Sequence, residues 1–243
     1  FNGGSASSYW STFTFYFLWW FGIGCQLNSC WDTSKYLQAK QLCISYNLRM
    51  KILITGAHFT PAVAVVEELK KYPDVHVVYV GRKTTQEGDP SPSAESKVLP
   101  KLGVKYIPIV TGRLQREFTP YTLLSLLKIP VGFIQALIIV LSEKPKVVLS
   151  FGGYVAVPTV FTAWLFSIPI IVHEQTLVSG LANKISSFFA DKIALSFRRD
   201  GFADKTLLTG DPIRSMIVNG VKLAHPRGVL RSHRKTILIT GGN

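Results

Sequence analysis

From Met50 onward, short runs of β-branched and aliphatic residues alternate with longer runs of helical periodicity. Short apolar runs bounded by glycine, proline and polar residues are typical of buried parallel strands, and the longer runs are typical of the helices that connect them. The alternation predicts an α/β fold with a doubly wound, Rossmann-like parallel sheet. The predicted strands are 51–55, 75–80, 105–109, 147–150, 168–173, 192–196 and 206–209, and the predicted helices are 61–72, 120–143, 157–166 and 181–190.

Two later segments depart from this pattern. Residues 82–97 are rich in proline, serine and charged residues, which predicts a polar loop outside the core. Residues 236–240 form one more apolar run, followed by Gly241, Gly242 and Asn243. We therefore expect one α/β domain over 50–212, a linker over 213–235, and over 236–243 the start of a second α/β domain that this chain does not complete.

The first 49 residues differ in composition from the rest. They hold all three cysteines and four of the five tryptophans and contain no methionine before Met50. We interpret residues 1–49 as a read-through leader rather than an evolved domain. The aromatic run 13–25 offers a rival interpretation as a signal peptide or anchor, but it is shorter than the roughly 20 residues that a spanning helix needs, and no basic residue precedes it.

The chain is strongly basic, with a formal net charge of +13. Such a charge favours an anionic partner, which could be nucleic acid, anionic lipid or a phosphorylated substrate. Zinc-ligand spacing, an RNA-binding aromatic signature and a dense basic helix are all missing from the sequence, which argues against nucleic acid. Because no cysteine follows residue 49 and no metal-ligand spacing is present, we expect neither a metal site nor any other cofactor.

Two glycine-containing turns follow predicted strands. Thr55, Gly56 and His58 follow the first strand, and Gly152 and Gly153 follow the fourth. Ligands of an open parallel sheet bind at its carboxyl edge, where backbone N–H groups and helix N-termini favour anions. Two such turns on one edge suit a diphosphate, although the first glycine alone could simply make its turn.

A third turn combines an acid, amides and a hydroxyl. It contains Glu174, Gln175 and Thr176, with Asn183 shortly downstream. Such groups could orient a sugar or peptide, with Glu174 or His58 as the base that deprotonates an acceptor hydroxyl. The plainer alternative is that Glu174 and Gln175 satisfy neighbouring backbone groups.

The segment 118–140 is strongly apolar and lies near Arg113, Arg116 and Lys128. An interfacial patch that contacts anionic lipid and a core helix broken near Pro130 explain this pattern about equally well. A nucleotide-dependent Rossmann oxidoreductase is less consistent with the chain, because its first turn should read G-x-G-x-x-G. The chain has TGAHFT there instead.

The motifs FGGYVAVP, PIIVHEQT, GLANK and TGDPIR follow one another in this order, and together they resemble the MurG family. The resemblance implies an inverting hexosyltransferase of the two-domain GT-B type, which transfers N-acetylglucosamine from UDP-N-acetylglucosamine to lipid I. It further implies peptidoglycan synthesis at the cytoplasmic face of the bacterial plasma membrane. The alternatives are a related enzyme with another lipid-linked acceptor, or a non-catalytic acceptor-binding subunit.

Carried over by motif, the resemblance also assigns residue roles. His58 and Glu174 are the expected catalytic residues. The expected acceptor-binding residues are Thr55, Gly56, Gly152, Gly153, Tyr154, Gln175, Thr176 and Asn183, and the expected donor-binding residues are Arg214, Gly241, Gly242 and Asn243.

The sequence departs from the family pattern at three places. The family's longer GGTGGH loop is shortened here, and Ala57 has a Cβ where glycine would allow close phosphate approach. Thr176 and Asp211 each stand where the family usually has asparagine. Because most of the donor half is missing, we do not expect the segment to catalyse transfer alone.

Overall fold

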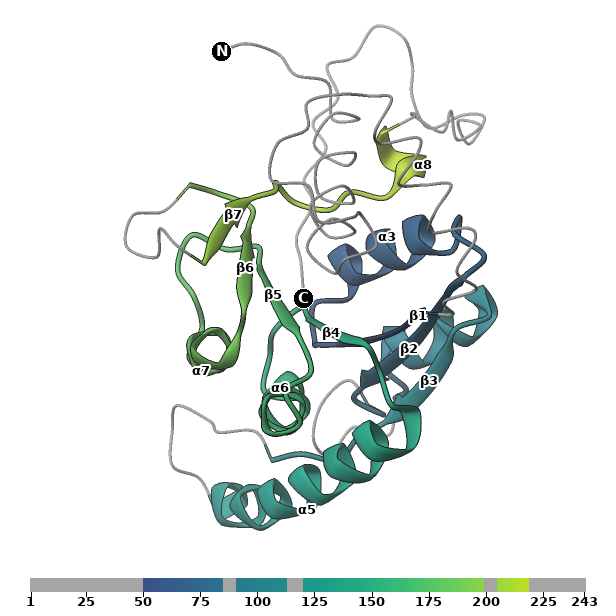
Figure 1. The fold of residues 1–243 in the computed structure, drawn as a ribbon. Helices are drawn as coiled ribbons and strands as arrows, with labels where there is room; N and C mark the ends of the chain where they lie inside the picture. Colours follow the sequence, from purple (N-terminus) through teal and green to yellow (C-terminus); the bar gives the residue numbers. More distant parts are fainter. Residues whose placement is uncertain (1–49, 85–90, 113–119, 199–204, 219–243) are drawn as a thin grey trace, which may run out of the picture.

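The computed structural model describes residues 50–84, 91–112, 120–198 and 205–218 (Figure 1). The predicted leader 1–49 lies outside the described residues. The same holds for the predicted strand 236–240 and for the glycine loop that follows it.

A seven-stranded sheet forms the centre of the fold, with the strand order β3-β2-β1-β4-β5-β6-β7 and parallel pairing throughout. The predicted doubly wound parallel sheet is therefore confirmed. The strands are β1 (Met50–Thr55), β2 (Val75–Gly81), β3 (Lys105–Pro108), β4 (Val147–Ser150), β5 (Ile170–Glu174), β6 (Lys192–Leu195) and β7 (Thr206–Leu208). The helices are α3 (Phe59–Leu69), α4 (Ala94–Val98), the 3-10 helix η1 (Pro100–Leu102), α5 (Pro120–Glu143), α6 (Ala156–Leu165), α7 (Leu181–Phe189) and α8 (Ser215–Val218).

The sheet has a hydrophobic core on each face because successive side chains of a strand point to opposite sides. Ile52 and Ile54 of β1 pack in one core, which also holds the buried side of α3. Leu53 packs in the other core, which also holds Ala136 of α5 and Val160 of α6. Figure 1 shows α3 on one side of the sheet and α5, α6 and α7 on the other. Continuous apolar strands are the sequence signature of this burial on both faces.

The strand order reverses between β1 and β4. The chain first builds outward from β1 to β2 and β3, and α5 then returns it to β4, which pairs with the free side of β1. The turns after β1 and β4 therefore diverge to helices on opposite faces and leave an opening at the carboxyl edge. The two glycine turns lie at this switch point.

The expectation of a polar loop over 82–97 is wrong at its C-terminal end. Residues 94–98 form α4, and the side chain of Ser93 caps this helix by accepting a hydrogen bond from the backbone N–H of Ser96 at 3.2 Å. Glu95 is only 1% exposed and lies 3.8 Å from Arg82. The polar composition concealed this segment because its buried residues are polar groups with a charged or hydrogen-bonding partner.

The helix α5 continues through Pro130, so the predicted break there is wrong. The core-helix interpretation of this segment is confirmed for one side of α5 only. Ala136 and Ile139 are buried against the sheet, whereas Ile134 and Ile138 are about 60% exposed, at 58% and 60%. In the described part of the chain, no helix combines the length and apolarity that crossing a bilayer requires.

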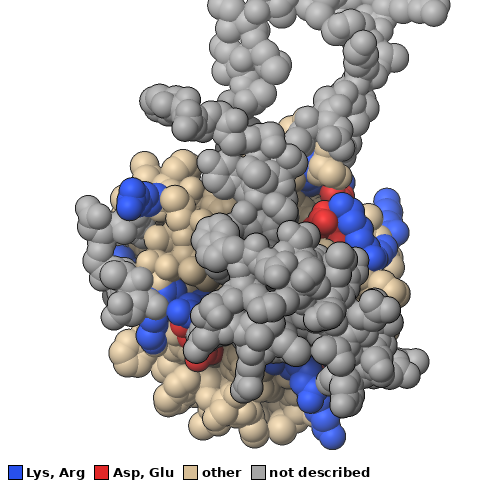
Figure 2. Space-filling model, turned by 45° about the horizontal axis from the view of Figure 1, so that its top comes forward, with Lys and Arg blue, Asp and Glu red and all other residues tan. Residues whose placement is uncertain are grey.

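Basic side chains are visible at several places on one face of the molecule. Figure 2 shows lysine and arginine at several separate positions, with the few visible acidic side chains beside basic ones. The lysine and arginine side chains visible on this face are therefore not gathered into one group.

Candidate functional site

Buried contacts hold the turn between β1 and α3 in place. Thr55 is fully buried, and Gly56 adopts φ +149°. A Cβ at Gly56 would lie 2.9 Å from the backbone carbon of Phe151, so only glycine fits against the neighbouring turn. The hydroxyl of Tyr79 donates a 3.0 Å hydrogen bond to the carbonyl of Gly56. The turn therefore has a fixed backbone conformation.

The turn between β4 and α6 contacts the first turn directly. Gly152 and Gly153 have φ values of +73° and +83°, in the left-handed region that favours glycine. The backbone N–H of Ala57 donates to the carbonyl of Gly152 at 2.9 Å. A Cβ at Gly153 would lie 2.6 Å from the Cβ of Ala57. The structure thus brings the two predicted glycine turns together as one surface.

The N-terminus of α3 opens onto this surface. His58 is the N-cap residue, but no side chain caps the helix, and its first turn holds no acidic residue. The first N–H groups of the helix are therefore free to bind an anion. The His58 side chain is exposed, yet the surrounding loops remove enough hydration to lower its pKa, and the Glu174 carboxylate partly opposes this. The imidazole is accordingly neutral at pH 7 and can accept a proton.

Glu174 at the end of β5 is a buried carboxylate with several hydrogen bonds. One oxygen accepts from the backbone N–H and hydroxyl of Thr176 at 3.1 and 2.5 Å, and the other accepts from the side-chain amide of Asn183 at 2.9 Å. Burial opposes ionisation of Glu174, but the hydrogen bonds from Thr176 and Asn183 outweigh it and lower its pKa. The carboxylate is therefore charged and engaged on both oxygens.

Asn183 connects this carboxylate to the second glycine turn. It is 4% exposed, and a Cβ at Gly152 would lie 1.9 Å from its side-chain oxygen. Any residue other than glycine at position 152 would displace Asn183 from Glu174. The third predicted turn is thus packed directly on the second, and its groups belong to the same site.

His173, which precedes Glu174 in β5, is a neutral imidazole in the interior. It is fully buried, and its Nε2 is 3.4 Å from both the carbonyl of Gly210 and the hydroxyl of Ser196. Burial lowers its pKa to about 4. Because it has no surface exposure, we assign it a structural role between β5 and the turn that follows β7.

The remaining predicted residues have other environments. Tyr154 packs against the core on the α5 side, and Gln175 is half-buried beside His173. Arg214 forms hydrogen bonds of 3.0 and 2.5 Å to Glu67 of α3. The structure therefore ties the segment after β7 to α3. Gly241, Gly242 and Asn243 lie outside the described residues.

Sequence reasoning missed a polar cluster next to the turn between β1 and α3. It consists of Tyr79, Arg82, Glu95 and Tyr106, which come from β2, β3 and the segment around α4. The usable signal was the pair Gly81-Arg82 directly after a predicted strand, at the carboxyl edge. Within the described ranges, His, Cys, Asp and Glu side chains form no group of three or more that could hold a metal ion.

Comparison with known proteins identifies relatives of this chain. The N-terminal domain of glycosyltransferase family 28 matches residues 55–195. A curated UDP-N-acetylglucosamine–N-acetylmuramyl-(pentapeptide) pyrophosphoryl-undecaprenol N-acetylglucosamine transferase of Clostridium botulinum is 36% identical over 204 residues, covering 79% of this chain and 54% of the relative. The protein of the same name from Caldicellulosiruptor saccharolyticus is 38% identical over 194 residues, covering 78% and 50%.

Among solved structures, Acinetobacter baumannii MurG resembles the chain with a TM-score of 0.51 and 23% identity, covering 68% of this chain and 46% of that one. This likeness supports the fold. The chain spans about half the length of the curated relatives, at 54% and 50%.

Proposed function

This chain belongs to glycosyltransferase family 28 through its N-terminal domain, and we propose that it forms the acceptor-binding part of an N-acetylglucosaminyltransferase. The proposed reaction transfers N-acetylglucosamine from UDP-N-acetylglucosamine to lipid I, a muramoyl peptide on undecaprenyl diphosphate. The product is lipid II for peptidoglycan synthesis. The names of the relatives from Clostridium and Caldicellulosiruptor support this choice of donor and acceptor.

The observation that carries the proposal is the contact between the two glycine turns at the switch point. Gly56 and Gly152 let the two turns approach closely, Gly153 is only half-buried, and the N-terminus of α3, which no side chain caps, begins beside them. This geometry suits a diphosphate, whose oxygens accept hydrogen bonds from backbone N–H groups and favour the positive end of a helix dipole. A diphosphate is the group that joins the sugar to the lipid in the proposed acceptor.

In the proposed mechanism, His58 is the general base. Its lowered pKa keeps the imidazole neutral at pH 7, so that it can take the proton of the acceptor hydroxyl. The hydroxyl oxygen then attacks the anomeric carbon as the bond to UDP breaks, which inverts the configuration. The negative charge of Glu174 favours the resulting imidazolium through its electrostatic effect on His58.

We propose a positioning role for Glu174 rather than a second base. Both of its oxygens accept hydrogen bonds, and its pKa is lowered, so it takes up protons poorly at neutral pH. Through Asn183 it fixes the packing on Gly152, and through Thr176 it fixes the loop after β5. Gln175 and Thr176 border this loop and are proposed to contact the acceptor sugar or peptide.

The proposed domain organisation assigns the acceptor to residues 50–212, the linker to 213–235 and the donor to a second domain beginning at 236. Arg214 is proposed to approach the donor from the linker while its pairing with Glu67 fixes the start of that segment. The glycine loop at 241–243 is proposed to contact UDP.

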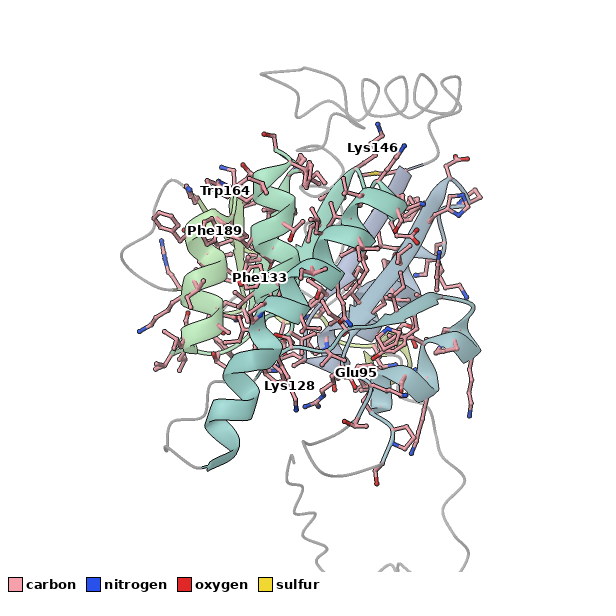
Figure 3. All side chains as sticks on the ribbon, turned by 90° about the horizontal axis from the view of Figure 1, so that it is seen from below. Glu95, Lys128, Phe133, Lys146, Trp164 and Phe189 are labelled. Carbon is pink, nitrogen blue, oxygen red and sulfur yellow. The ribbon has the colours of Figure 1, made fainter. Side chains whose placement is uncertain are left out.

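We further propose that the face formed by α5, α6 and α7 rests on anionic lipid at the cytoplasmic surface of the plasma membrane. Aromatic rings connect these helices through the contacts of Phe133 with Phe161, and of Phe161 with Trp164 and Phe189 (Figure 3). Exposed apolar side chains on these helices or directly after α6 include Val131, Ile134, Ile138, Leu141, Trp164, Leu165, Phe166, Leu181 and Phe188. Such a large apolar surface is unusual for a protein in free solution.

Binding of the 243-residue chain to vesicles tests the proposed acceptor. We expect vesicles with lipid I to bind more chain than vesicles with undecaprenol. A Gly153→Val variant should lose this difference, because the new side chain would overlap with that of Ala57 and displace the turn. Lys146→Gln, at the opposite edge of the sheet, serves as the control. Equal binding to both kinds of vesicle would contradict diphosphate recognition and leave only membrane adsorption.

A further inference from the structure

Arg82 lies at the same sheet edge as the glycine turns. It directly follows β2, and the parallel pairing of Thr55 in β1 with Val80 in β2 places residues 56–58 and Arg82 just beyond the ends of adjacent strands. Its side chain is 29% exposed, so the guanidinium is partly open to solvent. Its positive charge also contributes to the lowered pKa of His58, as expected for a cation close to that turn.

The backbone at Arg82 is fixed by two hydroxyl groups. Tyr106 and Ser93 both donate hydrogen bonds to its carbonyl, the latter at 2.7 Å. The ring of Tyr106 stacks on that of Tyr79 with the centroids 6.0 Å apart, and Tyr79 in turn holds the carbonyl of Gly56. One pair of stacked tyrosines therefore sets the position of Arg82 relative to the first glycine turn.

The glycine at position 81 makes this arrangement possible. A Cβ there would lie 2.9 Å from both the hydroxyl oxygen of Tyr106 and a ring carbon of Tyr79. The pair Gly81-Arg82 thus combines close approach of the two rings with a cation at the next position.

Glu95 supplies the buried counter-charge for Arg82. Its carboxylate is 1% exposed, lies 3.8 Å from the Nε of Arg82, and accepts no hydrogen bond on either oxygen. Because burial of a charged group is costly without an opposite charge nearby, the position of Glu95 favours the Arg82 guanidinium at this edge. At 3.8 Å the pair is not a bidentate hydrogen-bonded one, and the guanidinium retains donors for a second anion.

The glycine turns by themselves offer few donors and no positive charge. The N–H of Ala57 is used by the carbonyl of Gly152, the N–H of Gly152 is used by the hydroxyl of Ser150, and Pro61 in the first turn of α3 has no N–H. Neither TGAHFT nor FGGYV contains lysine or arginine. A diphosphate carries at least two negative charges, which neutral dipoles offset only in part.

We propose that Arg82 is a diphosphate-binding residue of this site, held by Glu95 and supplying the positive charge that the shortened glycine turns lack. This inference rests on the proposed function of the site and adds a residue to it. Arg82 contributes a planar fork of N–H donors to phosphate oxygens, and Glu95 acts through Arg82 as a positioning residue.

The test is calorimetric titration of the 243-residue chain with inorganic pyrophosphate at low ionic strength. Arg82→Gln is expected to weaken binding about tenfold or more, because a hydrogen bond to a charged group is lost. Arg82→Lys is expected to recover part of the loss, and Glu95→Gln to weaken binding less than Arg82→Gln. Lys146→Gln removes the same charge at the opposite edge and is expected to bind like the unchanged chain (Figure 3). Thermal unfolding of each variant identifies any that fails to fold.

The outcomes separate this inference from the proposed function. Binding that is lost in Gly153→Val but unchanged in a folded Arg82→Gln variant would overturn the role of Arg82 and leave the glycine turns as the diphosphate site. Equal weakening by Arg82→Gln and Lys146→Gln would reduce the effect to overall charge and also overturn it. Absence of pyrophosphate binding in the unchanged chain would overturn both.

Discussion

Replacement of Gly153 by alanine tests the contact on which the proposed site depends. The new Cβ would lie 2.6 Å from the Cβ of Ala57, whereas two carbon atoms in contact are ~3.5 to 4 Å apart. The overlap is expected to cost about 1 to 3 kcal/mol, as overpacking of a rigid region usually does. The φ of +83° at Gly153 adds a backbone cost of about 1 to 2 kcal/mol for alanine. Together they predict a loss of roughly 2 to 5 kcal/mol in the free energy of unfolding.

A double-mutant cycle separates the two costs. In an Ala57→Gly background the steric overlap disappears, so Gly153→Ala is expected to cost only the backbone contribution of about 1 to 2 kcal/mol. Urea unfolding of the four proteins, followed by tryptophan fluorescence and compared at unchanged m-value, gives the coupling energy. If Gly153→Ala costs the same with alanine as with glycine at position 57, the two turns do not touch, and the proposed contact between them is wrong.

Three further predictions concern buried charged or titratable groups. His173 has a pKa of about 4 in the folded chain against an ordinary value of 6.5, so the unfolded chain binds more protons between these pH values. The free energy of unfolding should therefore fall by up to about 3 kcal/mol from pH 7 to 4. The urea midpoint of His173→Asn should fall less steeply over this pH range. An equally steep fall in the variant would contradict the lowered pKa of His173. Glu174→Gln places an amide donor against a donor of either Asn183 or Thr176, so it should lower the free energy of unfolding by about 1 to 3 kcal/mol and weaken lipid I binding. If the variant keeps both its stability and its binding, Glu174 has no positioning role. Glu143 accepts hydrogen bonds from two lysines, and chiefly the one of 2.6 Å from Lys105 lowers its pKa. The stabilisation that these bonds give the fold is therefore present above the ordinary pKa of glutamate and is lost as the pH falls through the lowered pKa of Glu143. Glu143→Gln should cost roughly 1 kcal/mol at pH 7 and flatten the acid limb of stability, and an unaltered acid limb would count against the ion pair.

The elements of the fold follow closely from local pattern. All seven strands predicted between residues 50 and 212 form, with ends that shift by at most two residues, for example 168–173 against Ile170–Glu174. These strands could be predicted because a parallel strand buried on both faces must be apolar along its whole length. The helix α4 could not be predicted in this way, because Ser93 and Glu95 are buried through polar partners that lie elsewhere in the sequence.

The candidate site likewise has some features that the sequence could predict and others that it could not. Gly56, Gly152 and Gly153 could be recognised in the sequence because glycine at a strand end implies either an unusual φ or close backbone approach. That Gly153 meets Ala57, and that Asn183 packs on Gly152 while holding Glu174, depends on which strands become neighbours. The role of each charged group follows from its burial and partners, which no local pattern encodes.

The sequence by itself determined the class of fold and the family resemblance, and it indicated the edge of the sheet at which we propose that a ligand binds. These properties follow from the period of apolar residues and from glycine at strand ends, both of which are local. The tertiary structure decided that Glu174 is engaged on both oxygens, that His58 is accessible, and that Arg82 stands beside the glycine turns. These depend on contacts between residues distant in sequence, because hydration, charge and packing act through space rather than along the chain.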